Sequence, residues 1–99
     1  MSKEELSILR NQIDKLDEKL FSMIFKRMNI AKKIGEIKVQ NNMEIANSDR
    51  ENELIKHILG LSDNSLDKDE VESIYKLFFS ISKKRQDSYK KQFRVCRTS

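Results

Sequence analysis

Apolar residues recur along the first part of the 99-residue chain at alternating intervals of three and four. This spacing predicts a helix over residues 4–40 with one apolar stripe, formed by Leu6, Leu9, Ile13, Leu16, Leu20, Met23, Ile30, Ile34 and Ile37. Only Gly35 interrupts the helix-favouring sequence, at a cost of about 1 kcal/mol. Such a helix would be about 55 Å long, whereas a compact domain of this size has a radius of gyration of about 13 Å. We therefore expect a second copy of the chain to cover the stripe in an intertwined homodimer.

The residues that follow predict a turn and then a short helix. Turn-prone asparagines occur in the segment "QNNMEIAN", residues 40–47. Ser48, followed three residues later by Glu51, is typical of a capping box at a helix N-terminus. We therefore predict a helix over residues 49–59 that Gly60 ends. Its inward side chains would be Leu54, Ile55, Ile58 and Leu59.

A polar loop, "LSDNS" at residues 61–65, separates this helix from a third one. Asp67 and Glu70 form a second capping-box pattern, which predicts a helix over residues 67–92 and a tail over 93–99. The inward residues of this helix would include Val71, Ile74, Phe78 and Ile81. The predicted fold class is all-α: a single domain made of one very long, one short and one medium helix.

The amino-acid composition agrees with long helices, and the charge distribution argues against one class of partner, nucleic acid. The chain has no proline, two glycines and 36% charged residues. Its net charge is only +4, from 20 basic and 16 acidic residues. The basic excess gathers after Lys83 but has little aromatic interleaving and no docking motif, so we expect no nucleic acid partner. A basic C-terminal turn on a solvated helix explains the excess.

Other function classes find little support in the sequence. The longest apolar runs are a few residues, so no membrane span is expected. Cys96 is the one cysteine and His57 the one histidine, which argues against a metal site. The N-terminus has no apolar signal core. These features favour a cytoplasmic location.

Position 27 belongs to the apolar stripe but holds an arginine. A buried, unpaired guanidinium is very costly, so an anion should face Arg27. Lys38 lies almost three full turns later, about 16 Å away, and points the same way, so both could converge on one small anion. Arg10 lies about 25 Å before Arg27; it could reach such a ligand only from the partner of an antiparallel dimer. A salt bridge between chains is the alternative, with acidic candidates Asp14, Asp17 and Glu18.

On the third predicted helix, Ser82 and Gln86 lie one turn apart on one face. They interrupt a side that begins with Tyr75 and Phe78. Polar residues at the end of an apolar stripe are often only helix-end residues, so this pair has no specific meaning by itself.

Taken together, these residues resemble the all-helical chorismate mutase family, the AroQ class. The likeness covers about residues 5–90. It consists of Arg10, "LDEKL" (16–20), Arg27, "AKKIGEIK" (31–38), "DRE" (49–51), Ser82 and Gln86. The resemblance implies an enzyme that converts chorismate to prephenate by a Claisen rearrangement, on the route to phenylalanine and tyrosine. It also implies a homodimer with shared active sites, no metal, no cofactor, and frequent fusion to another enzyme of the pathway.

The family's site residues carry over to the matching positions of this chain. Arg27 would hold one substrate carboxylate, and Arg10 would reach the second carboxylate from the partner chain. Lys38 and Gln86 would donate hydrogen bonds to the ether oxygen whose bond breaks. The resemblance therefore makes Lys38, Gln86 and Arg27 the catalytic residues.

The remaining substrate-binding positions are less uniform. Glu51 would accept a hydrogen bond from the ring hydroxyl of the substrate, although it could also serve only as a helix cap. Arg50 and Ser82 would complete the carboxylate side. The family often has a carboxylate where this chain has Asn47, so only a backbone contact is expected there. A proline-containing hinge of the family is also replaced here by "MEIANS", residues 43–48.

Two alternative functions stay open at this point. An isochorismate-pyruvate lyase of the same fold uses a similar basic pocket, although Glu51 beside Arg50 favours the mutase. A non-catalytic helical dimer that binds nucleic acid through the basic residues 83–97 would leave the spacing of Arg10, Arg27 and Lys38 unexplained. A regulatory module of a larger enzyme is the other form of this non-catalytic alternative.

Overall fold

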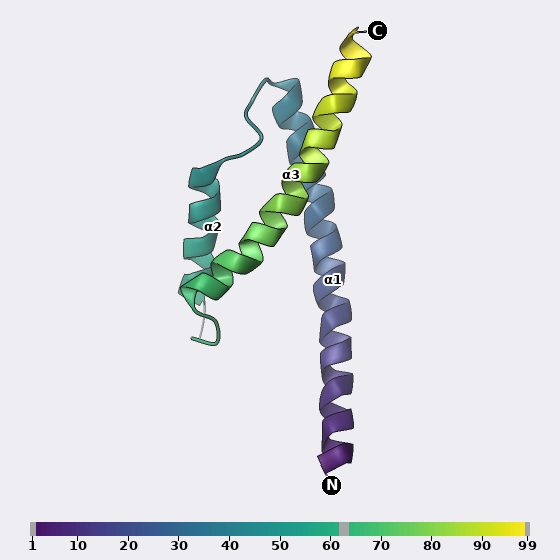
Figure 1. The fold of residues 1–99 in the computed structure, drawn as a ribbon, viewed down its shortest axis with the longest axis vertical. Coiled ribbons are helices and arrows are strands. Elements are labelled where there is room, and N and C mark those ends of the chain that lie inside the picture. Colours follow the sequence, from purple (N-terminus) through teal and green to yellow (C-terminus); the bar gives the residue numbers. More distant parts are fainter. Residues whose placement is uncertain (1, 62–63, 99) are drawn as a thin grey trace. The chain divides into compact units, whose positions relative to one another are not determined.

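The computed structural model describes residues 2–61 and 64–98, the last five of them as backbone alone. Across these residues the chain forms three helices and no strand: α1 (Ser2–Gln40), α2 (Ser48–Leu61) and α3 (Lys68–Thr98) (Figure 1). The all-α prediction is confirmed. The chain divides into two compact units, Met1–Ile30 and Ala31–Ser99, which are described in turn. Residues 62 and 63 of the predicted polar loop lie outside the described residues.

The first unit is the N-terminal part of α1, and its apolar stripe is exposed. Relative exposure of the stripe residues in this unit ranges from 46% for Leu6 to 62% for Leu16. Phe21 and Phe25, one turn apart beside the stripe, have ring centroids 6.2 Å from each other and are exposed as well. Exposed apolar area of this extent on a folded chain marks an interaction surface.

The second unit begins with the last turns of α1, which end in a Schellman motif. Asn42 has a positive φ of 57°, the left-handed conformation that asparagine tolerates well. The Met43 N–H donates to the Lys38 carbonyl at 2.7 Å, and the Asn42 N–H donates to the Val39 carbonyl at 3.3 Å. These bonds satisfy carbonyls that the helix end would otherwise leave unpaired. The end at Gln40 agrees with the predicted one.

The start and the end of α2 both correct the sequence prediction. Asn47, not Ser48, is the N-cap residue: its side-chain oxygen accepts a hydrogen bond from the Arg50 N–H at 3.0 Å. Gly60 does not end the helix, which continues to Leu61. No glycine among the described residues has a positive φ, so Gly60 does not adopt the left-handed conformation of a C-terminal cap.

The capping box at the start of α3 is confirmed. The Asp67 N–H donates to the Glu70 carboxylate at 2.9 Å, and the Glu70 N–H donates to the Asp67 carboxylate at 2.8 Å. At its other end α3 runs to Thr98, beyond the predicted end at residue 92, so the residues expected as a tail are helical up to this point.

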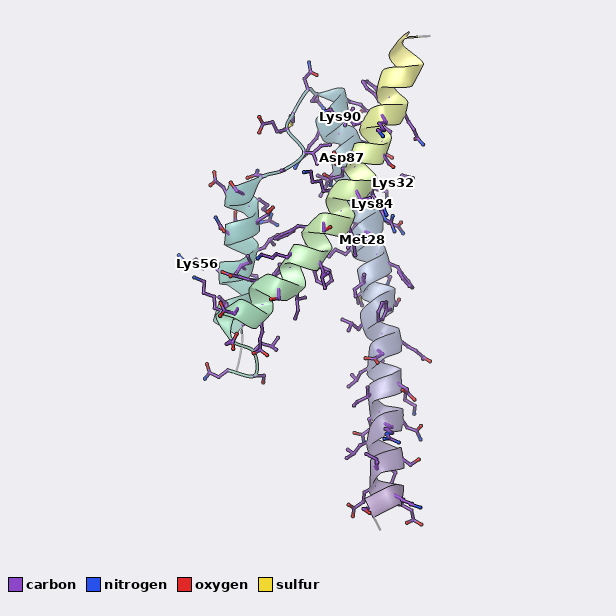
Figure 2. The ribbon with its side chains drawn as sticks, in the orientation of Figure 1. Met28, Lys32, Lys56, Lys84, Asp87 and Lys90 are labelled. Atoms are coloured by element: carbon purple, nitrogen blue, oxygen red, sulfur yellow. The ribbon has the colours of Figure 1, made fainter. Side chains whose placement is uncertain are left out.

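Within the second unit, α2 packs against the N-terminal half of α3 (Figure 1). The predicted inward residues of α2, from Leu54 to Leu59, are half-buried, and none of its described residues is fully buried. Lys56 projects from α2 on the side away from α3 (Figure 2). On α3, Tyr75 stacks on Phe79 with ring centroids 5.2 Å apart and meets Phe78 edge-on at 6.0 Å.

Two residues of the predicted α3 core are exposed in the single chain. Val71, at 2% relative exposure, is the most buried apolar side chain among those that the structure describes, whereas Ile74 is 41% and Ile81 38% exposed. Both isoleucines lie about 60° around the helix from Val71 or Phe78, on the flank of the stripe. The apolar pattern of α3 is therefore wider than the surface that this chain itself covers.

Candidate functional site

Of the predicted site residues, two arginines belong to the first unit. Both lie on α1, where Arg10 is exposed and Arg27 is half-buried. They are 17 residues apart on one continuous helix, about 25 Å along its axis. That separation is larger than two arginine side chains can close around one small ligand, so the two cannot serve one site from the same chain.

Lys38, near the end of α1, is half-buried and held by the loop that follows it. Its Nζ donates a hydrogen bond to the Ile45 carbonyl at 2.7 Å. An ammonium carries three N–H donors, so this bond fixes the side chain while two donors can serve a ligand. The α1–α2 loop thus places a charged donor in a defined direction.

Ser82 and Gln86 are buried polar residues of α3, at 9% and 7% relative exposure. The Gln86 Nε2 donates a hydrogen bond to the Ala31 carbonyl on α1 at 2.8 Å. No buried side-chain nitrogen or oxygen among the described residues lacks a partner. Burial therefore separates this pair from ordinary residues at the solvated end of a helix, which the sequence alone could not do.

The start of α2 carries three further predicted site residues. Asn47 uses its side-chain oxygen as the helix cap. Arg50 forms an exposed ion pair with Glu53 at 2.9 Å. A guanidinium has five N–H donors, so this pair does not prevent Arg50 from binding a carboxylate. Glu51 is half-buried, and it is not part of the predicted box with Ser48, because Asn47 caps the helix.

A further bond between α1 and α3 was not anticipated from the sequence. The Gln40 Nε2 donates to the Tyr89 hydroxyl at 3.1 Å, and the Tyr89 ring stacks on Phe93 with centroids 6.1 Å apart. This bond lies one turn of α3 beyond Gln86. It holds together the two helix segments that carry Lys38 and Gln86. No pattern in the sequence pairs residues 49 positions apart.

A shallow groove of 410 Å³ lies elsewhere on α3, and none of the predicted site residues lines it. Figure 2 labels Lys84 and Asp87 from this face. Counted at about 100° per residue, it lies on the opposite side of α3 from Ser82 and Gln86. Its lining residues are Ser80, Lys83, Lys84, Asp87, Ser88 and Lys91.

The described part of the chain contains neither a metal-binding cluster nor a membrane-spanning helix. No group of three or more His, Cys, Asp or Glu residues there is arranged to hold a metal ion. No helix in residues 2–61 and 64–98 combines the length and the apolar character needed to cross a bilayer.

Comparison with known protein families shows to which family this three-helix chain belongs. The family model described as "Chorismate mutase type II" matches residues 9–87. The chain belongs to the type II chorismate mutase family. The predicted resemblance is therefore confirmed, and membership of this family supports chorismate mutase activity. The match begins one residue before Arg10 and ends one residue after Gln86, so it includes all the candidate site residues.

Curated relatives of this chorismate mutase domain are longer proteins with two activities in their names. Similar regions occur in bifunctional chorismate mutase/prephenate dehydratases of three bacteria. The Aquifex aeolicus protein is 42% identical over 59 residues, covering 60% of this chain and 16% of that protein. The Pseudomonas aeruginosa protein is 33% identical over 82 residues, covering 78% and 22%. The Buchnera aphidicola protein is 29% identical over 94 residues, covering 94% and 25%. The chain thus spans between about a sixth and a quarter of their lengths.

Proposed function

We propose that the chain catalyses the rearrangement of chorismate to prephenate. One observation carries the proposal: the family match spans residues 9–87 and contains every candidate residue from Arg10 to Gln86. The local geometry agrees with it, because the side chains of Lys38 and Gln86 are each held by a hydrogen bond to a backbone carbonyl.

The reaction suits donors that do not themselves react. In the rearrangement one carbon–oxygen bond of the ether breaks while one carbon–carbon bond forms in the same molecule, so no nucleophile and no general base is needed. Electron density grows on the ether oxygen as its bond lengthens. The Lys38 ammonium and the Gln86 amide N–H donate to this oxygen, and they stabilise the transition state more than the substrate. Preorientation by the Ile45 and Ala31 carbonyls lowers the cost of aligning them.

The substrate is a flexible dianion, and arginines position it. Arg27 holds one carboxylate, and Arg50 and Ser82 complete that side, while Glu51 accepts from the ring hydroxyl. Arg10 of the partner chain binds the second carboxylate. Bidentate arginine contacts fold the molecule into the conformation from which it reacts.

The site therefore requires an intertwined homodimer. Two observations support this assembly: the exposed apolar stripe of the first unit and the 25 Å between Arg10 and Arg27. Sedimentation at micromolar concentration should give twice the 11.7 kDa chain mass. A folded monomer under those conditions would contradict the shared site.

The product also points to a second activity. The curated relatives combine a mutase with a prephenate dehydratase by name. We propose that this chain is fused to, or associates with, an enzyme that consumes prephenate. A cytoplasmic location belongs to the same proposal, supported by the use of a single cysteine.

The deciding experiment supplies the purified chain with chorismate and follows the formation of prephenate. Isochorismate is supplied in a parallel reaction. Prephenate from the first reaction is the expected result. Pyruvate release from isochorismate alone would identify a lyase instead, and no turnover of either compound by a verified dimer would indicate a non-catalytic helical module.

A further inference from the structure

Gly35 is a buried residue of α1 that lies directly under Gln86 of α3. A Cβ atom built on Gly35 would overlap the Gln86 Cγ and would lie 2.9 Å from the Gln86 Cβ and 3.2 Å from its Cα. The last of these atoms is backbone, so a side chain at position 35 would push α3 itself away, not only a flexible side-chain end. Gly35 has no positive φ. Space, and not backbone conformation, is therefore what requires a glycine here.

The close approach brings Gln86 to one particular acceptor. In an α-helix the carbonyl of residue 31 accepts the N–H of residue 35, and its second lone pair remains for another donor. The Gln86 Nε2 uses that lone pair at 2.8 Å. A carbonyl can only accept, so it selects the orientation in which the amide nitrogen, not the amide oxygen, faces α1. One Nε2 proton is then fixed on Ala31, and the other has a defined direction.

We propose that Gly35 is a positioning residue for Gln86. By lacking a side chain it lets Gln86 reach the Ala31 carbonyl, which sets the side-chain amide so that its second N–H serves the reaction. The catalytic consequence rests on the proposed function, whereas the positioning of the amide does not. Gly35→Ala is the test, and Gly60→Ala is its matched control, because a Cβ at helical Gly60 would meet nothing within 4 Å.

The first measurement compares kinetics of the full chain. We expect Gly35→Ala to lower kcat by tenfold or more with a smaller change in KM, since a transition-state contact is misplaced. Gly60→Ala should stay within twofold of wild type. The double variant Gly35→Ala/Gln86→Ala should be no more than about twofold worse than Gln86→Ala, because the two residues act as one unit. Losses that multiply would show that Gly35 acts independently of Gln86 and would overturn the proposal.

The second measurement does not depend on activity. The side-chain amide of Gln86 is assigned in an NMR spectrum by its loss in Gln86→Ala. In the wild-type chain we expect one of its two protons to exchange slowly, and we expect Gly35→Ala, but not Gly60→Ala, to abolish this protection. An unprotected amide in the wild-type chain, or protection that survives Gly35→Ala, would overturn the proposal.

Two further outcomes are distinguishable. Were Gly35→Ala not to fold, the double variant Gly35→Ala/Gln86→Gly should recover folding, because it removes both the Cγ and the Cβ that a side chain at position 35 would overlap. A double variant that stays unfolded would contradict the coupling. A wild-type chain with a protected Gln86 amide but no prephenate formation would contradict the proposed function and leave the positioning intact.

Discussion

The two compact units differ in how far their side chains find contacts within the same chain. Residues 2–30 present a regular apolar stripe whose members are roughly half exposed. Residues 31–98 hold Lys38, Asn47 and Gln86 in hydrogen bonds to nearby backbone groups. Polar groups that must point accurately are thus organised within one chain, whereas the apolar surface of the long helix is left uncovered by its own chain and is the surface that the proposed dimer would bury. Both sides of this comparison can be tested.

The largest effect is expected in the second unit, at Lys38. In the proposed reaction Lys38→Ala removes a charged donor from the ether oxygen. Loss of one such donor corresponds to about 3–4 kcal/mol, or several hundredfold in kcat. The measurement is steady-state turnover, with thermal unfolding as a check, because the Ile45 bond is also lost.

Lys56→Ala is the control for this variant, since Lys56 is exposed on α2 and lies away from α3 (Figure 2). It should retain wild-type turnover. If Lys38→Ala kept activity within threefold of wild type, the role of Lys38 would be only to hold the loop through its hydrogen bond to Ile45.

The next effect tests the dependence of the first unit on a second chain. Arg10→Ala and Arg27→Ala homodimers should each be nearly inactive. Subunits of the two variants, unfolded and refolded together, should recover roughly a quarter of wild-type activity, because about half of the dimers are mixed and each of these has one intact site. The readout is prephenate formation by the refolded mixture.

Recovery should be absent when either variant is refolded alone. Heterodimers that are proven to form but stay inactive would place both arginines in a single-chain role. In that case Arg10 would not serve the site of a second chain, and a dimer would contribute only to the stability of the first unit.

A smaller and pH-dependent effect is expected for Gln86→Glu. A carboxyl donates a hydrogen bond only when protonated, and burial raises its pKa above the ordinary value of about 4.3. Since the protonated form is favoured in the folded chain, both activity and stability should be highest in acid and fall as pH rises through the raised pKa. Rate profiles and unfolding midpoints across pH measure this.

The wild-type amide gives the reference for that variant, because an amide donates at every moderate pH and its profile should be flat. Full activity of Gln86→Glu above pH 8 would show that Gln86 does not donate a hydrogen bond to the ether oxygen. The second unit would then organise only one donor for the reaction.

The smallest effect concerns the cap of α2. Asn47→Ala should lower the free energy of unfolding by about 1 kcal/mol, because the Arg50 N–H loses its acceptor. Ser48→Ala, one residue later, should change it by much less. Chemical denaturation of both variants measures the difference, and equal losses would mean that the cap is shared.

The sequence predicts the helices well because their signals are local. The 3–4 spacing and the Asp67–Glu70 box each depend on residues within one or two turns, and both appear in the structure. The α2 boundary was harder, since Asn47 and Ser48 are both good N-cap residues and only the geometry distinguishes them. Gly60 was misjudged because glycine weakens a helix by only about 1 kcal/mol and need not end it.

The residues of the candidate site could be proposed from the sequence, but their contacts could not. Ser82 and Gln86 interrupt an apolar stripe in the sequence, but only the structure shows that they are buried. The contact of Gly35 with Gln86 likewise depends on how two helices approach, and their separation and register are set by tertiary packing. A glycine inside an otherwise strong helix was the one available signal, and it indicated only a local cost.

The two hydrogen bonds between Lys38 and the α1–α2 loop limit the changes in loop length that this chain can accept. Its carbonyl accepts the Met43 N–H and its ammonium donates to the Ile45 carbonyl. Lys38 therefore fixes the backbone path of the loop at two positions. One inserted residue would displace the Ile45 carbonyl by up to about 3.5 Å, more than a hydrogen bond tolerates. Insertions and deletions, which surface loops usually accept, should therefore be selected against between residues 42 and 46, while single substitutions there that keep the backbone path remain neutral.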